Sequence, residues 1–407
     1  MNAVSQVLTA GELGTFRGGS GFPVRYQGKK SGDLPFFKVS DMNSEGNEQF
    51  MTRANNYISE ARRKALGAVR MPKRAIVFAK VGAAVFQERK RILAQDSCID
   101  NNMAAFIVDE SKLDVRFAYH LLTAFRMSDL VAVGALPSLN GGQLRSIPLL
   151  VPNQLSEQRQ ISSTLTDADD LISALERLIA KKRAIKQGML QRLLSGSTRL
   201  HGFSDAWISS RLGALGSFLK GRGIKRDDVR AIGVPCIRYG EIYTAFGDYT
   251  DRTRSFVASD VAASAVPLRR GDVLFAGSGE TKAEIGMSLA YVGDEEAVAG
   301  GDIVIFRGES FNPVFLASLL NTPSIASQKA RKGQGDAVVH ISSSALADLR
   351  MRVPDRDEQD AIAAVIEEVD RELSALDSRL DKARAIKQGM MQQLLTGRVR
   401  LPAEVTT

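Results

Sequence analysis

The feature that most limits how this chain can fold is a long internal repeat. Residues 157–200 recur as residues 358–401, so each position of the second copy lies 201 residues after its counterpart, and roughly half of the aligned positions are identical. The block Arg-Ala-Ile-Lys-Gln-Gly-Met is unchanged between the copies. A sequence with such an internal repeat is expected to form the same structural unit twice.

The segments that precede the two copies also resemble each other, although less closely. Residues 34–42 match residues 234–243, residues 103–123 match residues 302–322, and both halves reach a Val-Pro pair just ahead of the repeated block. We therefore predict two larger domains that alternate with two helical regions, in sizes that are ordinary for domains. The four predicted segments are residues 1–152, 153–200, 201–354 and 355–401.

The repeated blocks have the apolar spacing of long helices. Their apolar residues follow alternating steps of four and three, which is the heptad seam of a coiled coil, and no proline interrupts either block. After a gap the steps become four and four, at Ile185 and Ile386, which predicts a stutter in the heptad. The predicted seam residues are Ile161, Leu165, Ala168, Ile172, Leu175, Ile179, Ile185, Met189 and Leu193, and in the second block Ile362, Ile366, Val369, Leu373, Leu376, Leu380, Ile386, Met390 and Leu394.

Each helix would be about 60 Å long at 1.5 Å per residue, which is too long for burial inside one small domain. Its seam must therefore meet another helix, and the other copy is the obvious partner. The first helix ends in basic residues and the second begins with acidic ones, which favours an antiparallel pair. The predicted fold class is mixed α+β (α/β), with two domains related by a pseudo-two-fold axis and separated by two long antiparallel coiled-coil helices.

The two larger domains have the sequence pattern of mixed α/β structure. Short β-branched and aromatic runs, bounded by Gly, Pro, Asn and Asp, predict strands in both domains. One amphipathic helix is expected in each, at residues 115–125 and at residues 313–320. We predict a twisted, partly closed sheet with a few helices in each domain. The predicted strands lie within residues 35–39, 75–82, 104–108, 235–239, 272–277 and 302–306.

No pattern of catalytic or metal-binding residues stands out. Cys98 and Cys236 are too few for a disulfide framework or a zinc cluster, and the three histidines lack Ser, Cys or metal-ligand companions at useful spacing. Residues 311–315 and 277–282 resemble a methyltransferase motif and a phosphate loop, but both fail the required spacing. We therefore predict a binding protein with no catalytic residue and no bound metal.

The charge balance favours an anionic partner such as nucleic acid, since 54 Lys+Arg face 46 Asp+Glu, for a net charge of +8. Residues 1–150 carry +7 and residues 201–352 only +1, so the second domain would have to use local clusters. No apolar run approaches the ~20 residues that cross a bilayer, and the first residues lack the apolar core of a signal peptide. These features predict a cytoplasmic protein with no membrane partner.

Candidate DNA-binding residues come from basic clusters at glycine-rich loops. Lys and Arg bind phosphates, Arg, Asn, Gln and Tyr read bases, and glycine lets a backbone approach a phosphate. For any one such residue the alternative is an exposed charge without a partner. Residues 329–335 form the sharpest cluster and are predicted to be a loop ahead of the last strand. The candidates are Arg17, Lys29, Lys30, Lys38, Arg53, Asn140, Lys220, Arg222, Arg238, Tyr239, Arg331, Lys332 and Gln334.

Two glycines lie inside the predicted helices, where glycine costs about 1 kcal/mol relative to alanine. Gly188 and Gly389 have identical neighbours, which predicts that another surface approaches closely, either the sister helix or a partner subunit. The candidate partner-binding residues are Lys186, Gln187, Gly188, Lys387, Gln388 and Gly389.

This organisation resembles the specificity subunit of type I restriction-modification enzymes. Two dissimilar α/β units, each followed by Val-Pro, Glu-Gln and a long helix that ends in the repeated Arg-Ala-Ile-Lys-Gln-Gly-Met block, carry the resemblance over essentially the whole chain. It implies that residues 1–152 and 201–354 are target recognition domains, each of which binds one half of a bipartite site in double-stranded DNA. It also implies that the helices set the spacer and dock two methyltransferase (modification) subunits, through which restriction subunits join.

The resemblance implies that this chain holds no cofactor. S-adenosylmethionine, ATP and Mg²⁺ would belong to the partner subunits of a site-specific endonuclease and adenine methyltransferase, in which this chain is a non-catalytic subunit. One alternative is an orphan interaction protein that binds methyltransferase subunits without productive DNA recognition. Another is an enzyme with a fused activity, which the missing catalytic motifs disfavour.

Overall fold

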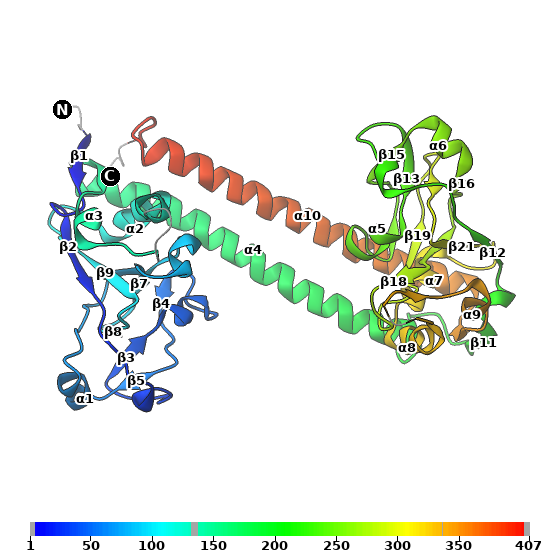
Figure 1. Ribbon diagram of the computed structural model, residues 1–407, viewed down its shortest axis with the longest axis horizontal. Coiled ribbons are helices and arrows are strands. Elements are labelled where there is room, and N and C mark those ends of the chain that lie inside the picture. The colour runs from blue at the N-terminus through cyan, green and yellow to red at the C-terminus, as the bar shows by residue number, and fades with distance from the viewer. Residues whose placement is uncertain (1–4, 132–136, 336, 403–407) are drawn as a thin grey trace. The chain divides into compact units, whose positions relative to one another are not determined.

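Two long helices, α4 (Leu155–Ser195) and α10 (Arg356–Leu394), are each shared between two compact units of the chain (Figure 1). The structure is a computed structural model that describes residues 5–131, 137–335 and 337–402. The first unit is Met1–Glu176 with Ser378–Thr407, and the second is Arg177–Asp377. Each unit therefore combines one mixed α/β domain with part of both long helices.

The described residues of the first unit's domain form three sheets. A five-stranded sheet has the order β2-β9-β6-β7-β4, a three-stranded sheet has the order β5-β3-β8, and β1 pairs with β10 as a two-stranded ribbon. Its strands are β1 (Ser5–Thr9), β2 (Gly14–Gly18), β3 (Leu34–Phe37), β4 (Phe50–Met51), β5 (Tyr57–Ile58), β6 (Ile76–Ala79), β7 (Lys90–Leu93), β8 (Cys98–Ile99), β9 (Met103–Val108) and β10 (Pro148–Pro152). Its other helices are η1 (Val24–Tyr26), η2 (Val39–Asn43), α1 (Glu60–Ala65), η3 (Ala83–Gln87), α2 (Val115–Ala124), η4 (Met127–Leu130) and α3 (Gly141–Arg145).

The domain of the second unit repeats this plan. The five-stranded order is β12-β21-β17-β19-β14, a four-stranded sheet has the order β15-β13-β20-β16, and β11–β23 and β18–β22 are two-stranded ribbons. Its strands are β11 (Ile208–Arg211), β12 (Ser217–Lys220), β13 (Val234–Ile237), β14 (Tyr249–Thr250), β15 (Ser255–Val257), β16 (Val266–Pro267), β17 (Val273–Ala276), β18 (Ser278–Gly279), β19 (Ser288–Tyr291), β20 (Val298–Ala299), β21 (Ile303–Arg307), β22 (Val339–His340) and β23 (Arg350–Val353). Its other helices are η5 (Leu212–Ala214), η6 (Arg226–Asp228), α5 (Tyr239–Thr244), α6 (Ser259–Ser264), α7 (Pro313–Leu320), α8 (Pro323–Lys332) and α9 (Ser343–Ala347).

The predicted mixed α+β class and the predicted strands are confirmed, whereas the single partly closed sheet is wrong. Each domain is divided into separate sheets, because short strands such as β3 and β13 pair with neighbours outside the five-stranded sheet. α7 confirms the helix that was expected at residues 313–320. Asn312 accepts a hydrogen bond from the Phe315 N–H at 3.1 Å, and a proline occupies the first turn.

Both long helices complete the core of each domain. In the first unit Ile161 and Leu165 from the start of α4, and Leu394 from the end of α10, pack in one cluster with the aromatic core. In the second unit the end of α4 and the start of α10 do the same, with Leu193 and Ile362. Each domain is therefore anchored by two helix ends that lie far apart in the sequence.

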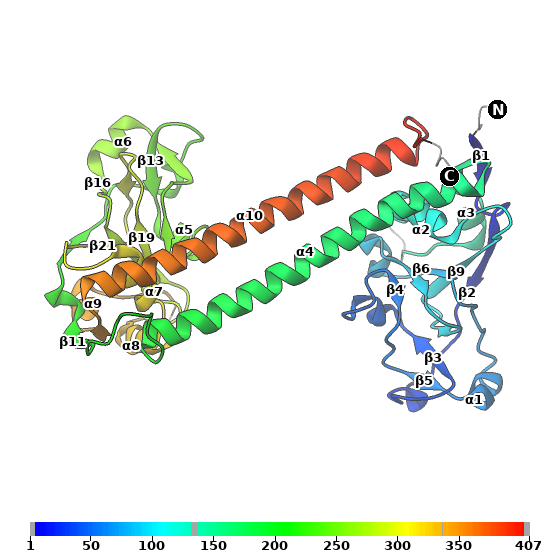
Figure 2. The same cartoon turned by 180° about the vertical axis from the view of Figure 1, so that it is seen from behind.

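Within each unit the two helices run in opposite directions (Figure 2), as predicted. Ion pairs join Arg384 to Glu176 in the first unit, at 2.6 Å, and Arg183 to Asp377 in the second, at 2.9 Å. The charge pattern of the sequence thus appears as contacts between the helices.

The predicted stutter in the heptad is wrong. Ile185 and Ile386 are 56% and 61% exposed, so neither belongs to the seam. The steps of four and three continue instead through Lys186 and Lys387, whose side chains are half-buried. The prediction failed because an apolar residue stands next to a seam lysine in both copies.

Candidate nucleic-acid interface

In both units a glycine that follows the first strand of the five-stranded sheet crosses another segment at close range. A Cβ atom on Gly19 would stand 1.9 Å from the carbonyl oxygen of Asp100, and one on Gly221 would stand 2.1 Å from that of Gly300. No other residue fits at either position without a shift of the backbone. Glycines near basic residues were expected to let the backbone approach a phosphate, but at these two positions the absence of a side chain is already required for the crossing.

A basic residue occupies the same point beside each crossing. Lys38 and Arg238 precede η2 and α5, and each donates its backbone N–H to a carboxylate three residues later, Asp41 at 2.7 Å and Glu241 at 2.9 Å. The residue before each one accepts a backbone hydrogen bond from the crossed segment. The two predicted DNA-binding residues are thus structural counterparts, placed by the same local geometry.

In the first unit, Lys29, Lys30, Lys38 and Arg53 surround one polar network. Lys30 Nζ donates to Asn55 Oδ1 at 3.4 Å, and Asn55 Nδ2 donates to Asp41 Oδ1 at 2.7 Å. The buried Asn47 donates to the carbonyl oxygen of Arg53 at 2.8 Å. The network fixes the backbone of these basic segments while leaving Lys29, Lys30 and Arg53 exposed.

An aromatic side chain lies beside this group and was missed in the sequence. The Tyr26 ring lies between two guanidinium groups, with Arg25 Cζ 4.9 Å and Arg62 Cζ 4.1 Å from its centroid. Both arginines are exposed. The pair Arg25-Tyr26 is a local signal, but Arg62 comes from α1 and only the fold brings it to the ring.

Arg17 and Asn140 form a second group in the first unit, together with Lys80. Arg17 is exposed on β2. Gly18 follows Arg17, and a Cβ atom on Gly18 would stand 2.9 Å from Lys80 Nζ. The carbonyl oxygen of Lys80 accepts from the N–H of the residue before Asn140. Asn140 Oδ1 caps α3 by accepting from the Gln143 N–H at 2.9 Å, so its amide N–H₂ is the part directed to other partners.

In the second unit, Lys220, Arg222, Arg238 and Tyr239 gather around the glycine crossing. The exposed Lys220 and Arg222 flank Gly221, and the crossed residue Gly300 hydrogen-bonds to the residue before Arg238. Arg238 Nη2 lies 3.6 Å from Glu241 Oε1, and its buried Nε has no partner in the described part of the chain. These four predicted residues therefore share one surface region.

The cluster at residues 329–335 differs from the prediction of a loop. Residues 329–332 form the last turn of α8, and Gln334 pairs through its backbone with His340. Lys329 is buried and its Nζ donates to the carbonyl oxygen of Gly286 at 2.6 Å, so it is closed to DNA. Burial lowers the pKa of Lys329 to about 7. Arg331 and Gln334 of this cluster are exposed, and Lys332 is half-buried.

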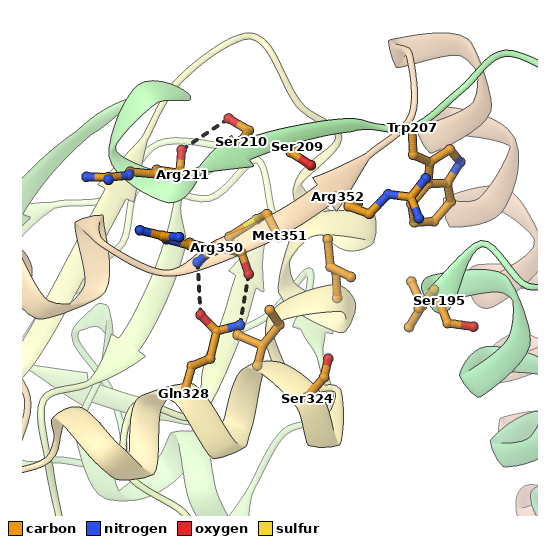
Figure 3. A pocket seen from close by; sticks show the side chains of 13 residues that line it. Ser195, Trp207, Ser209, Ser210, Arg211, Ser324, Gln328, Arg350, Met351 and Arg352 are labelled. Carbon is orange, nitrogen blue, oxygen red and sulfur yellow. Dashed lines mark hydrogen bonds between the residues drawn. The ribbon is translucent and has the colours of Figure 1, made fainter.

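Beside α8 lies a shallow cavity of about 670 Å³ with arginine and serine side chains in its wall (Figure 3). It is lined by β11, β23, α8 and the end of α4, and it adjoins a second cavity of about 260 Å³ that includes Arg331 and Lys332. Arg211 and Arg350 line both cavities. These two arginines were missed in the sequence, because they are far apart along the chain and neither lies near a glycine-rich cluster.

The comparisons with known proteins agree with this architecture. Residues 5–187 match the family model for the type I restriction modification DNA specificity domain. The type I restriction enzyme MjaVIII specificity subunit of Methanocaldococcus jannaschii is 23% identical over 301 residues, which are 70% of this chain and 69% of the relative. The putative MjaX specificity subunit of the same organism is 22% identical over 322 residues, 74% and 72% of the two chains.

Residues 5–187 therefore contain a type I restriction modification DNA specificity domain, and the chain is similar to specificity subunits over about 70% of its length.

Two solved structures share the fold of this chain. The crystal structure of the S subunit from M. genitalium is 14% identical, covers 97% of this chain and 96% of its own, and has a TM-score of 0.62. A chain from a structural study of complex assembly in the type I R-M system is 15% identical, covers 98% and 99%, and has a TM-score of 0.58. At these identities the likeness concerns the fold alone.

The predicted partner-binding residues of this chain lie on the long helices α4 and α10. Lys186 pairs with Asp370, and Lys387 pairs with Asp169 at 2.5 Å, so both lysines hold the helices together. A Cβ on Gly188 or Gly389 would meet nothing within 4 Å. The sister helix therefore does not require these glycines, and Gln187 and Gln388 beside them are exposed.

Three further findings concern the described part of the chain. Among residues 5–131, 137–335 and 337–402, no group of three or more His, Cys, Asp or Glu side chains is placed to hold a metal ion. Over the same residues, none of the helices combines the length and the apolar character needed to span a bilayer. Both cysteines are buried, and burial raises the pKa of each thiol to about 11.

Proposed function

We propose that this specificity subunit directs a type I restriction-modification complex to a bipartite DNA sequence. Residues 1–152 and 201–354 each read one half-site, and the helical regions 153–200 and 355–401 fix the spacer between the halves. The chain contributes binding and no catalysis. S-adenosylmethionine, ATP and Mg²⁺ act in the methyltransferase and restriction subunits. The complex works in the cytoplasm, where it meets cellular DNA.

The observation that carries the proposal is the pair of equivalent crossings with different surroundings. Lys38 and Arg238 are held by the same backbone geometry, but Lys38 stands beside lysines and an Arg-Tyr-Arg stack, whereas Arg238 stands beside Lys220 and Arg222. Equal scaffolds with unequal surface side chains suit a protein that reads two different short sequences.

The helix surfaces support docking of two identical subunits. Ile185 and Gly188 in the second unit, and Ile386 and Gly389 in the first, are the same residues at equivalent positions, and in the described structure nothing packs on either glycine. An exposed isoleucine beside a bare stretch of helix backbone suits close packing of another protein surface. Because this strip occurs once in each unit, two copies of one methyltransferase would each find the same surface.

A genome-wide map of N6-methyladenine tests the proposal. Cells that carry the methyltransferase are compared with and without the gene for this chain, and we expect a gene-dependent motif made of two parts with a fixed gap. Complementation with Arg238→Gln is expected to relax or lose one half of the motif, and Lys38→Gln the other half. If methylation is unchanged while the methyltransferase still co-purifies, the chain is an orphan interaction protein and the proposal is wrong.

A further inference from the structure

A group of four basic side chains lies where the ribbon β11–β23 meets α8. Arg211 and Arg350 come from the two strands, and Arg331 and Lys332 come from the last turn of the helix. All four line the cavity of about 260 Å³, together with Gln328 and Asp348. The cluster therefore combines three elements of the second unit.

The strand register places two arginines directly opposite each other. Arg211 and Arg350 are partners in the antiparallel pairing, and Figure 3 shows both side chains extending in the same direction from the ribbon. Like charges at directly opposed positions destabilise a strand pair. An anion between the two guanidinium groups would remove this cost.

A side-chain amide fixes α8 against the ribbon. Gln328 Oε1 accepts from the Arg350 N–H at 3.0 Å, and Gln328 Nε2 donates to the Arg350 carbonyl oxygen at 2.8 Å. Residues three and four positions further along a helix share the same face. Arg331 and Lys332 are thereby held beside Arg350, so the cluster is positioned by backbone contacts and not by chance exposure.

Only one carboxylate lies among these four cations in the lining of the cavity. Asp348 is 3.6 Å from Arg211 Nη1 and 3.4 Å from Lys332 Nζ, and the Asp348 and Arg211 side chains are largely exposed while that of Lys332 is about one third exposed. Exposed pairs of this kind are weak and exchange readily with other anions. The adjoining larger cavity adds hydroxyl groups, from Ser195, Ser209 and Ser324, and its described lining adds no further carboxylate.

The first unit has no equivalent of this cluster on its described ribbon. That ribbon, β1–β10, has the same antiparallel pairing, but the paired residues carry no charge: Ser5, Gln6, Val7, Leu8 and Thr9 face Pro152, Val151, Leu150, Leu149 and Pro148. The cluster is therefore particular to the second unit, in contrast to the duplicated crossings.

We propose that this cluster binds the phosphodiester backbone of duplex DNA and holds the second unit on it independently of base sequence. The proposal rests on the proposed function and adds a contact surface to it. Arginine forks, lysine and serine hydroxyls are the groups that bind DNA phosphates. The cavity has a volume of about 260 Å³ and two opposed arginines in its lining. A cavity of this size accepts a compact phosphate group better than the extended acidic face of a protein.

The test compares the salt dependence of DNA binding in the complex of the full chain with its methyltransferase subunits. Arg211→Gln with Arg350→Gln is expected to make the slope of log K against log [salt] shallower by about 0.9 for each lost phosphate contact, about 2 in all. Arg331→Gln with Lys332→Gln, which changes α8 instead of the ribbon, is expected to do the same. The methylated motif stays unchanged, because no base contact is removed.

Three variants serve as controls. Arg211→Lys with Arg350→Lys keeps the charge and retains the slope. Arg252→Gln with Arg270→Gln removes two charges that line a different groove of the second unit, and Lys329→Met removes a buried cation, so neither changes the slope.

An unchanged slope and affinity in both neutralised variants, or an equal change in the Arg252 and Arg270 control, would overturn the proposal. The proposal would also be overturned if the neutralised variants lost a protein subunit from the complex while the salt dependence of DNA binding stayed unchanged. That result would assign the cluster to an acidic protein partner. Failure of the proposed function is a separate result, in which the wild-type complex shows no preference for the bipartite duplex over a scrambled one. The slope comparison on the scrambled duplex then still decides the role of the cluster.

Discussion

Lys186 of α4 forms an ion pair with Asp370 of α10 inside the seam between the two helices. The same pair recurs 201 residues later in reversed roles, as Lys387 of α10 with Asp169 of α4. Both lysines stand at heptad positions that an apolar residue would normally fill. A polar residue at such a position selects register and orientation, since only the antiparallel alignment brings each lysine to its aspartate.

Loss of one seam lysine is expected to destabilise the first unit. Lys387→Met leaves Asp169 without its cation, and Asp169 Oδ2 is already buried without a partner among the described residues. We expect the free energy of unfolding to fall by about 1–3 kcal/mol, the usual cost of an unsatisfied buried polar group. Urea unfolding of the purified chain measures the change.

Arg384→Met is the matched control for Lys387→Met. Arg384 also pairs across the helices, with Glu176, but the two side chains are 53% and 46% exposed, compared with 18% and 25% for Lys387 and Asp169. An exposed pair contributes about 0–1 kcal/mol, so this variant should unfold close to the wild type. Equal losses for both variants would show that burial in the seam gives Lys387 no special role.

His120 is expected to make the first unit sensitive to acid. The ring is fully buried in α2, and neither nitrogen has a partner among the described residues. Burial, followed by the nearby charge of Lys387, lowers its pKa from 6.5 to about 4. The folded state therefore favours the neutral ring, and between pH 6.5 and 4 the unfolded state binds more protons.

The stability linked to His120 is fully present above pH 6.5 and is lost as the pH falls toward 4, by about 3 kcal/mol in total. His120→Leu is expected to flatten the fall in the free energy of unfolding over this range, whereas His201→Gln, at an exposed position, should leave it as it is. The same steep fall in the leucine variant would assign the acid sensitivity to other groups.

Trp207 gives a local optical signal for the junction between α4 and the second domain. It is the chain's single tryptophan, and its Nε1 donates a hydrogen bond to Glu358 Oε2 at 3.1 Å. Arg199 donates hydrogen bonds to both oxygens of the same buried carboxylate, at 2.5 and 2.6 Å. Glu358→Gln removes the charge that Arg199 requires, so we expect a loss of about 1–3 kcal/mol and a red shift of tryptophan emission.

The counterpart in the first unit provides the control for Glu358→Gln. Arg400 lies 3.9 Å from Glu157, which corresponds to Glu358 in the repeat, but no tryptophan is present there. Glu157→Gln should leave the emission of Trp207 unchanged. An emission shift in this variant, or none in Glu358→Gln, would contradict the assignment of the signal to the Glu358 contact.

Most of the fold could be predicted from the sequence because its strongest signals were long-range repeats and helical periodicity. The internal repeat alone implied two equivalent units, and the heptad steps placed Ile161, Leu165, Ile362 and Ile366 correctly on the buried side of the helices. The same pattern failed at Ile185, since periodicity counts apolar side chains and cannot recognise a lysine that is buried by an aspartate from another helix.

The candidate DNA-binding surface was only partly accessible to sequence reasoning. Basic residues near glycines could be selected, and Lys38 and Arg238 are counterparts in the structure. Lys329 was misjudged because its burial depends on the Gly286 carbonyl, a tertiary contact. Arg350 was missed, although the alternation Arg-Met-Arg-Val marks a strand with one exposed basic face. Their roles in DNA binding stay predictions.

Gly188 and Gly389 are expected to separate the stability of the chain from its capture of partner subunits. A Cβ atom on either glycine would meet no other group within 4 Å, so alanine fits both sites without a clash. Each Gly→Ala change should raise helix stability by about 1 kcal/mol, because alanine is the better helix former. The same methyl groups would obstruct a partner surface that packs closely on the helix backbone, so co-purification of the methyltransferase should fall. Unchanged capture by a more stable Gly188→Ala, Gly389→Ala chain would place the docking surface elsewhere.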